Sequence, residues 1–488
     1  MPITDSQFNA WLLRGDVDRC VLVEVDVWSG GSVVTRYFST HGFVSYPSDT
    51  PANTAYPEIL MQVPNYTSVL GEQLLGYSKP SVGELIIDNS NGVRDAWLLD
   101  AWDGRPFKLY LGDPRWTKAD FRLLIAGVVA DIYSPSNRTL SLRTRDKQHL
   151  LSKPVCTVLA GGTTANKDAR LPVCYGECYN VEPLLLDAAA RSYAVHDGQI
   201  EAITAVYEDG ATKAFTANLA AGTFTLTAAA SGRITADVKG SKTSGTYVNK
   251  TADIISRILQ ERAGLAGGEI DAASIAAMNA AVPGTVGVYL RDGSVAQALD
   301  TLIIGAGGFY SFDRAGLFYL DQFKAPSGSP LFALYADDID PEGLALVNRW
   351  LPSKTVRVGY KKQWTTQSDG LAAGVSDARR AELSQPYLIA KATNSIPQHL
   401  LAEEPAVEST VFINSSDASA EATRRAALFS VVRRLVKVRC FLAPALVKLG
   451  DVIATDIDRF GLGGGALARV VGIDESTTDK RVELTLFL

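Results

Sequence analysis

A β-hairpin pattern decides the fold: Leu124-Ile-Ala-Gly-Val-Val-Ala-Asp-Ile132, a polar turn, then Leu140-Ser-Leu-Arg-Thr144. The same pattern returns as Leu467-Ala-Arg-Val-Val-Gly-Ile473, a polar turn, then Val482-Glu-Leu-Thr-Leu486. Each copy is a short apolar run, a polar turn and an alternating strand, so the sequence predicts two related β-modules separated by other material. Hairpins of this type are common in all-β proteins, so two unrelated hairpins are the alternative interpretation.

Length and composition favour a soluble multidomain protein. The chain has 488 residues, of which 47% are hydrophobic and 20% charged. At roughly 100 to 200 residues per domain, we expect about three to four domains. No run approaches the roughly 20 apolar residues of a membrane span. The start, Met-Pro-Ile-Thr-Asp-Ser-Gln, lacks the basic and apolar regions of an export signal, which predicts folding in a cytosol.

The charge pattern disfavours tight, sequence-independent binding of nucleic acid. The formal net charge is −6, and Lys and Arg are scattered along the chain. Such a surface has no cluster of basic residues that could bind phosphate backbones and release their counterions. A mildly acidic protein is nevertheless suited to line a channel through which DNA passes, because its negative charges repel the DNA phosphates.

Changes in pattern divide the chain into four parts. We expect a β-rich module over residues 1–152, with a hairpin at 21–28 and 32–38, and an inserted small β-domain with a Cys-bearing loop over 153–248. Helical spacing near 253–262, 272–280 and 294–303, with a hairpin over 308–320, predicts an α+β domain over 249–350. Residues 351–488 form the last β-module, which contains a helix.

That helix is predicted to begin at Ser416 or Asp417, both good capping residues, and to run through Arg434. Its apolar positions, which we expect to face the core, are Leu428, Phe429, Val432 and Leu435. The same spacing directs Arg424, Arg425 and Arg434 toward solvent or a partner.

No motif in the sequence predicts an enzyme. It contains no G-x-S-x-G, H-E-x-x-H or P-loop pattern, and the histidines are far apart, at His41, His149, His196 and His399. The acidic group Asp337, Asp338 and Asp340 suits a cation or an acid pair, but is more often a solvated loop with capping residues. The glycines over 461–465 are followed by no helix, so we interpret them as a loop between strands rather than a phosphate cradle.

Among the residues of the sequence, the cysteines are the strongest candidates for metal ligands. Cys156, Cys174 and Cys178, with the distant Cys440 as a fourth ligand, offer the soft donors that zinc or an iron–sulfur cluster requires. The spacing lacks a tight C-x-x-C pair. Small hydrophobic cysteines in a core are the alternative, and the odd count of five argues for reduced thiols rather than a disulfide framework.

Several stretches resemble tail-tip and baseplate hub proteins of long-tailed, siphovirus-type bacteriophages. The resemblance rests on the segments Gly83-Glu-Leu-Ile-Ile-Asp-Asn-Ser-Asn-Gly92, Ala101-Trp-Asp-Gly-Arg105, Leu111-Gly-Asp-Pro-Arg-Trp116, the segment 121–131 with Gly127, Leu171-Pro-Val-Cys-Tyr-Gly176, Asn180-Val-Glu-Pro183, Tyr193-Ala-Val-His-Asp-Gly198, Val356-Arg-Val-Gly-Tyr360, Gly450-Asp-Val-Ile453 and Arg459-Phe-Gly-Leu462. They are loose motifs that together cover most of the chain.

The resemblance implies a β-rich α+β protein in which 1–152 and 351–488 are tube-like β-barrel domains. It further implies a homotrimeric virion hub, assembled in the host cytoplasm, that closes the distal end of the tail tube. Its partners would be the tube or a distal tail protein ring, tip or fibre proteins and the tape measure protein, with DNA passing through during ejection. A trimer carrying a duplicated contact unit matches a sixfold ring. Some tail-tip relatives hold an iron–sulfur cluster, but this cysteine spacing is too irregular to carry that over.

Three other functions stay open. A distal tail protein forms a hexameric ring and usually has one tube-like domain. A tail-associated peptidoglycan hydrolase would need a positioned acid pair or zinc site. A glycan-binding module would use the Trp and Tyr residues of 95–116 as a platform, although these are as easily core aromatics.

Overall fold

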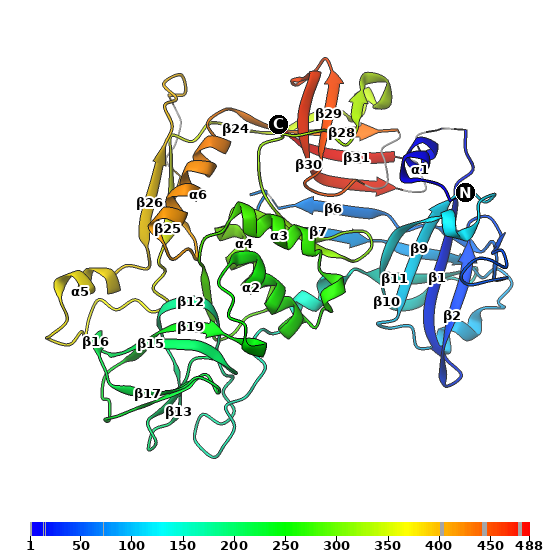
Figure 1. The fold of residues 1–488 in the computed structure, drawn as a ribbon. Helices are drawn as coiled ribbons and strands as arrows, with labels where there is room; N and C mark the ends of the chain where they lie inside the picture. Colours follow the sequence, from blue (N-terminus) through cyan, green and yellow to red (C-terminus); the bar gives the residue numbers. More distant parts are fainter. Residues whose placement is uncertain are drawn as a thin grey trace.

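The computed structural model describes residues 2–12, 14, 16–71, 73–400, 405–441, 447–476 and 481–488. In this part of the chain strands predominate and form several sheets, with few helices beside them (Figure 1). The β-rich, multidomain architecture predicted from the sequence is confirmed. None of the described helices is long and apolar enough to cross a membrane.

Two large sheets contain the repeated hairpins. The first has the strand order β2 (Ser32–Ser39), β1 (Cys20–Ser29), β9 (Pro106–Gly112), β10 (Arg122–Ser136), β11 (Thr139–Arg145), β8 (Glu84–Asp88) and β5 (Leu60–Gln62). The second has the order β22 (Phe318–Gln322), β21 (Gly308–Phe312), β7 (Gly76–Val82), β6 (Tyr66–Leu70), β30 (Leu462–Ser476), β31 (Arg481–Phe487), β28 (Arg433–Cys440) and β24 (Ala345–Trp350). Off that path, β29 (Val452–Ile457) pairs with β30 and with β23 (Ala333–Tyr335).

The two hairpins have the same construction. The first strand of each, β10 or β30, is 15 residues long, and the second, β11 or β31, is 7 residues long. Both pairs are antiparallel, and both contain a register shift, at Val129/Asp131 in one and at Val470/Gly472 in the other. The first hairpin has an additional shift at Tyr133/Ser136. A bulge of this kind bends and twists the long strand. The repeat predicted from the sequence therefore corresponds to two hairpins of matching strand lengths that have one register shift in common.

Two neighbouring chain segments run from one large sheet into the other. β7 ends at Val82 and β8 begins at Glu84, so a single residue, Gly83, separates a strand of the second sheet from a strand of the first. Beside it, β5 belongs to the first sheet and β6 to the second. The Gly83 N–H donates to the Asn65 carbonyl at 3.0 Å, and a Cβ on Gly83 would lie 3.2 Å from the Asn65 nitrogen. Glycine therefore permits the close approach of the two crossing segments.

One apolar core connects both large sheets. It contains Val23, Leu109 and Leu142 of the first sheet together with Val438, Ile473 and Leu486 of the second. A shared core of this kind makes the two sheets one packed unit rather than two independent domains joined by a linker.

Arg314, at the turn of the β21–β22 hairpin, joins the two sheets by polar contacts. Its carbonyl accepts from Ala126 of β10 at 2.7 Å, and its guanidinium donates to the carboxylate of Glu475 on β30. The guanidinium also lies 4.3 Å from the ring centre of Tyr66 on β6. Arg314 and Glu475 are both buried, so their ion pair forms inside the contact between the modules.

The remaining described elements form a helical layer and smaller sheets. The helices are α1 (Asp5–Leu12), α2 (Thr251–Ile258), α3 (Ala272–Ala281), α4 (Val295–Gly305), α5 (Asp377–Leu383) and α6 (Ser415–Leu428). Short helical turns are η1 (Asp95–Leu99), η2 (Lys118–Asp120), η3 (Lys147–Ser152), η4 (Thr243–Gly245), η5 (Leu259–Ala263), η6 (Gly267–Glu269), η7 (Ala336–Asp338) and η8 (Pro341–Gly343).

The small β-domain contains two sheets, ordered β16 (Ala211–Thr212), β15 (Ile200–Glu208), β19 (Ile234–Ser241), β12 (Val173–Val181), β20 (Gly287–Leu290), and β13 (Leu184–Asp187), β14 (Ser192–Ala194), β18 (Thr223–Leu226), β17 (Phe215–Asn218). The last two sheets are β26 (Leu388–Thr393), β25 (Thr355–Tyr360), β27 (Glu408–Ser409), and β3 (Phe43–Val44) with β4 (Ala55–Tyr56). α6 packs against β25 and β26.

Contacts cross two of the boundaries predicted from the sequence. β6 and β7, assigned to 1–152, pair inside the sheet that contains the C-terminal hairpin. Val356 and Ala422, assigned to 351–488, share a core with α2 and α4 of the predicted α+β domain. Pairing between distant segments has no local sequence signal, which is why periodicity alone did not reveal these contacts.

We expect Arg314→Met to lower the free energy of unfolding by about 3 kcal/mol, because it leaves the buried Glu475 carboxylate without its cation. Replacing both partners, as Arg314→Met with Glu475→Gln, should cost less than the single change. Urea denaturation of the purified chain measures both. Arg138→Met, in the exposed turn between β10 and β11, is the matched control and should stay within about 0.5 kcal/mol of the wild type. A single variant as stable as this control would contradict the role of Arg314.

Candidate assembly surfaces

Each large sheet ends in an exposed edge strand with neighbouring apolar residues. In the first sheet this is β2, where the exposed fractions of Val33 and Val34 are 50% and 38%. In the second it is β24, where those of Leu346 and Val347 are 41% and 49%. Every residue from 345 to 349 is exposed, and only Trp350, at the end of β24, packs against the core. The two strands lie on different sides of the molecule (Figure 1).

Such edges are unusual for a protein that acts as a monomer. An edge strand presents unpaired N–H and C=O groups, and proteins commonly protect it with Lys, Pro, bulges or a covering loop. Neither β2 nor β24 contains Lys or Pro, although β24 has a register shift between Leu346 and Asn348. The edges β2 and β24 are therefore candidate surfaces for strand pairing with another polypeptide.

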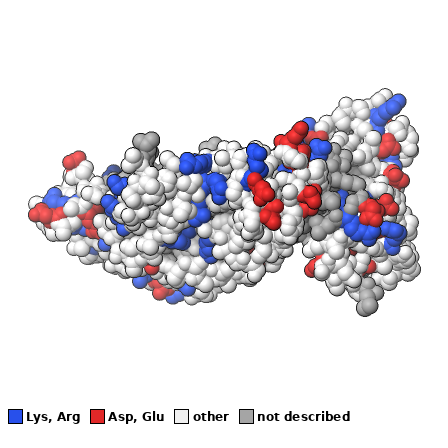
Figure 2. Space-filling model, turned by 90° about the horizontal axis from the view of Figure 1, so that it is seen from above, with Lys and Arg blue, Asp and Glu red and all other residues white. Residues whose placement is uncertain are grey.

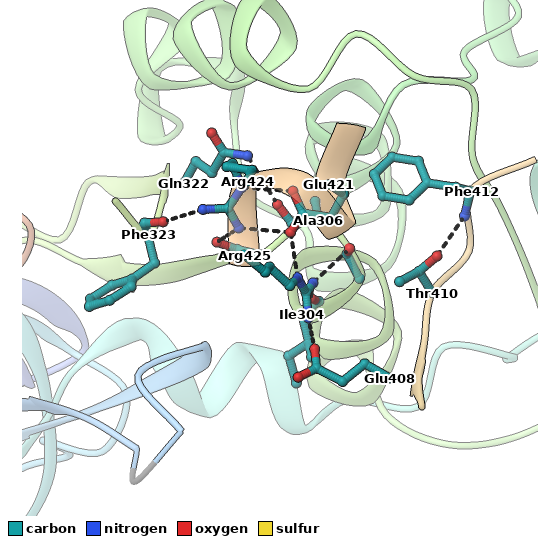
Figure 3. Close-up of polar contacts among 12 residues, drawn as sticks. Ile304, Ala306, Gln322, Phe323, Glu408, Thr410, Phe412, Glu421, Arg424 and Arg425 are labelled. Carbon is teal, nitrogen blue, oxygen red and sulfur yellow. Dashed lines mark hydrogen bonds and ion pairs between the residues drawn. The ribbon is translucent and has the colours of Figure 1, made fainter. Parts of the chain in front are cut away.

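α6 is fixed by a cluster of the buried Glu421 and Arg425 and the half-buried Arg424 (Figure 3). The Arg425 guanidinium donates to Glu421 Oε1 at 2.6 Å and contacts the Glu408 carboxylate. It also donates to the carbonyls of Ile304 and Gly305, at 2.7 and 3.0 Å, which end α4. A cation at this position satisfies carbonyls that have no partner within the helix and stabilises the negative end of the helix dipole.

Arg424 completes the cluster. It donates to Glu421 at 2.7 Å and to the Phe323 carbonyl, next to β22, at 2.6 Å. Burial raises the pKa of Glu421, although Arg424 acts in the opposite direction, and burial lowers the pKa of Arg425 to about 10. The cluster thus ties α6 to α4 and to the end of β22.

This arrangement corrects the prediction that Arg425 faces solvent or a partner. Only 4% of Arg425 is exposed, because Glu421, one turn earlier, accompanies it into the interior. The helix ends at Leu428, and β28 begins at Arg433, so Arg434 is a strand residue whose Nη1 donates to the Phe460 carbonyl at 2.6 Å. The spacing of Glu421 with Arg424 and Arg425 is the sequence signal that could have revealed the cluster.

The predicted cysteine ligands are buried in different cores. Cys156 lies in the core of the helical layer, Cys174 and Cys178 lie in that of the small β-domain, and Cys440 lies between the large sheets. Of the four, the structure brings together Cys174 and Cys178, both on β12, and burial raises the pKa of Cys178. Among the described residues, no three His, Cys, Asp or Glu side chains are grouped so as to hold a metal ion. The four cysteines thus do not form one site.

The other sequence candidates occupy structural positions. The Asp338 carboxylate accepts from the Tyr335 N–H, and that of Asp340 accepts from the Glu342 N–H, so both cap short helical turns. Gly461, in the turn before β30, and Gly464, within β30, both adopt positive φ, and the element that contains Gly464 is a strand rather than a helix. The prediction that 461–465 form a loop between strands is therefore wrong for residues 462–465, which begin β30, whereas Gly461 lies in the turn before it.

His196 belongs to a buried polar network in the small β-domain. Its Nδ1 accepts from the Cys174 N–H at 3.1 Å, which leaves the ring neutral with its proton on Nε2. The neighbouring Asp197 accepts both Nη groups of Arg262, at 2.6 and 2.8 Å, and Arg262 also donates to the Tyr175 hydroxyl at 2.9 Å. Arg262 comes from the turn that ends α2, so this network attaches the β-domain to the helical layer.

No protein-family model and no curated protein matches the sequence. Among solved structures, this chain is similar to a tail protein from Neisseria meningitidis, with 11% identity and a TM-score of 0.38 over 96% of each chain. It is similar to the 43 kDa tail protein of prophage MuSo2 from Shewanella oneidensis, with 9% identity and a TM-score of 0.42 over 96% of this chain and 98% of that chain. A prophage tail protein from Listeria monocytogenes gives 9% identity and a TM-score of 0.42 over 96% and 94%. All three are tail proteins.

The network predicts a pH dependence of stability. Burial lowers the pKa of His196 from 6.5 to about 4, with Asp197 raising it and Arg262 lowering it. Between these two values the unfolded chain binds a proton that the folded chain does not, so stability falls as the pH is lowered through this window. The loss amounts to about 3 kcal/mol by pH 4.

Unfolding measured from pH 7 to pH 4 tests this, with His196→Asn as the comparison, since its amide oxygen can accept the Cys174 bond without titrating. The variant should lose that part of the pH dependence. Equal slopes for the two proteins would show that His196 does not titrate as stated.

Proposed function

We propose that this chain is a structural virion protein, the hub that closes the distal end of a phage tail tube. In this proposal three copies form a ring, and each contributes two tube-like domains built around the β10–β11 and β30–β31 hairpins. The role is mechanical rather than enzymatic. The hub joins the tube, or a distal tail protein ring, to tip or fibre proteins, and it opens for the tape measure protein and DNA.

The observation that carries the proposal is the matching of the two hairpin sheets within one core. Strand lengths and one register shift agree between the hairpins, and Leu142 and Leu486 lie in the same core. Three copies of a chain with two such modules present six similar units, which a sixfold tube requires.

The exposed edges support ring formation. Because β2 and β24 belong to different sheets and lie on different sides of the chain, contact between β2 of one copy and β24 of the next is heterologous. A heterologous contact produces a closed ring when the rotation between copies closes. The exposed apolar residues of both strands would be buried in such a ring.

The charge distribution suits a duct for DNA. On the face shown in Figure 2, basic and acidic side chains are interspersed and do not form one large patch of a single charge. On β28, Lys437 and Arg439 pair with acidic groups, at 2.7 Å to Glu483 and at 3.4 Å to Asp340. Paired cations attract phosphates weakly, so DNA would pass without specific binding.

A distal tail protein ring is the second candidate, since it also ends a tube. It is distinguished by six copies per particle and by one tube-like domain per chain. An image of the assembled particle decides between three and six copies.

We expect Val347→Lys to prevent assembly while leaving the single chain folded, because a charge on an exposed edge strand opposes pairing but disturbs no core. Wild type at high protein concentration should give a trimer by mass measurement, and the variant a monomer whose unfolding free energy changes by less than about 0.5 kcal/mol. Ile389→Lys is the matched control, because Ile389 is 51% exposed on β26, an edge of a different sheet. A Val347→Lys trimer, or six copies in the particle, would contradict the proposed hub.

A further inference from the structure

Three exposed apolar side chains project beside β2, the free edge of the first large sheet. They are Val93, Leu98 and Leu99, in the turn η1 and just before it, and we name them the η1 knob. Leu99 is 90% exposed, so the chain itself covers almost none of it. Large apolar side chains that are exposed together mark a surface that binds another molecule.

Polar contacts hold the η1 knob in place against β2. The Trp102 Nε1–H donates to the Trp97 carbonyl, inside the turn, at 2.7 Å. Arg36 of β2 donates to Asp100 at 3.1 Å, and its guanidinium lies 5.2 Å from the ring centre of Trp97. An anchor that is ordered before binding loses little conformational entropy when it binds. The turn therefore presents its leucines at a fixed place beside the β2 edge.

The free edge of the second large sheet, β24, ends at a mainly apolar pocket of about 420 Å³, which we name the β24 pocket. Trp350 is the last residue of β24 and lines it. The apolar part of the wall comprises Ile304, Phe323, Trp350, Leu351, Leu428 and Phe429. An apolar cavity of about 150 Å³ holds a benzene ring, so the β24 pocket has room for a leucine side chain.

The charged groups in the wall of the β24 pocket already have partners (Figure 3). Arg425 contacts the carboxylates of Glu408 and Glu421, and Arg424 pairs with Glu421 at 2.7 Å. Two cations thus face two carboxylates, and a charged ligand would enter without a counter-ion of its own. The β24 pocket therefore favours an apolar occupant.

The η1 knob and the β24 pocket of one chain lie apart from each other. The knob is attached to β2 through Arg36 and Asp100, and the pocket lies at the end of β24. These two strands are on different sides of the molecule (Figure 1). The occupant of the pocket therefore comes from another molecule, and the contact of β2 with β24 proposed above brings a knob and a pocket together.

We infer that the η1 knob of one copy inserts into the β24 pocket of the next copy, with Leu99 as the anchor. This inference rests on the proposed ring, in which β2 of one copy meets β24 of the next. Backbone hydrogen bonds repeat along a strand, so edge pairing alone specifies the register weakly. A leucine seated in a pocket fixes one register. Each contact uses one knob and one pocket, so a closed ring leaves none unfilled.

Analytical ultracentrifugation of the full chain tests the role of Leu99. Leu99→Asp should weaken assembly by about tenfold or more, because a carboxylate in the apolar part of the pocket has no partner. Leu99→Met keeps an apolar side chain of similar volume and should assemble like the wild type. Leu159→Asp is the matched control, because Leu159 is 52% exposed and belongs to neither large sheet. Thermal unfolding of the dilute chain should be unchanged in all three variants, since both positions are exposed.

Cysteine cross-linking tests the contact itself. A chain that carries Leu99→Cys and Leu351→Cys should form disulfides between copies when the oxidant diamide accepts the two thiol hydrogens. A gel without reductant should then show covalent trimers. The five native cysteines are all buried, so each single variant should stay uncross-linked. Leu159→Cys combined with Leu351→Cys is the control pair and should give no covalent trimer.

The results separate this inference from the hub itself. A trimer that withstands Leu99→Asp but is lost in Val347→Lys would overturn the inference and leave the ring standing. A trimer that Leu99→Asp weakens but that gives no Leu99→Cys, Leu351→Cys cross-link would also overturn it, because the knob then binds elsewhere. A wild type that stays monomeric at high protein concentration would overturn both the inference and the proposed ring.

Discussion

The packing of two hairpin sheets against one another is the constraint on which the rest of the structure depends. Burial of apolar surface supplies the main favourable free energy of folding, and here one core receives it from both sheets. The segments that cross at Gly83 and Asn65 and the buried ion pair of Arg314 and Glu475 fix how the sheets meet. Because the sheets cannot move separately without opening this core, the spacing of their two free edges is fixed.

Much of the local structure could be predicted from the sequence, because strand and helix periodicity are properties of neighbouring residues. The hairpins β1–β2, β10–β11, β21–β22 and β30–β31 all occur where alternation predicted them. The same holds for α2, α3 and α4, where apolar residues recur at helical spacing. In each case the periodicity that predicts the element lies within a short stretch of neighbouring residues.

Contacts between distant segments could not be predicted in this way. The pairing of β6 with β30 joins Val69 to Gly472, and no pattern within either strand specifies the other. Helical spacing predicts that Arg425 lies opposite the apolar positions of the helix, but Glu421 and the α4 carbonyls make its burial favourable. The cysteines share the soft donors that a metal site requires, but Cys156, Cys178 and Cys440 belong to three separate cores.

β24 shows why an assembly surface is difficult to recognise in a sequence. Ala345-Leu-Val347 has the composition of a buried strand, yet the structure leaves every residue of that stretch exposed. Sequence rules for a single chain assign apolar runs to its own core, and they fail where the run is completed by another molecule. A disagreement between apolar composition and exposure on a sheet edge is therefore itself evidence about function. A second case strengthens this evidence here, because Val33 and Val34 on β2, the edge of the other large sheet, are also apolar and exposed.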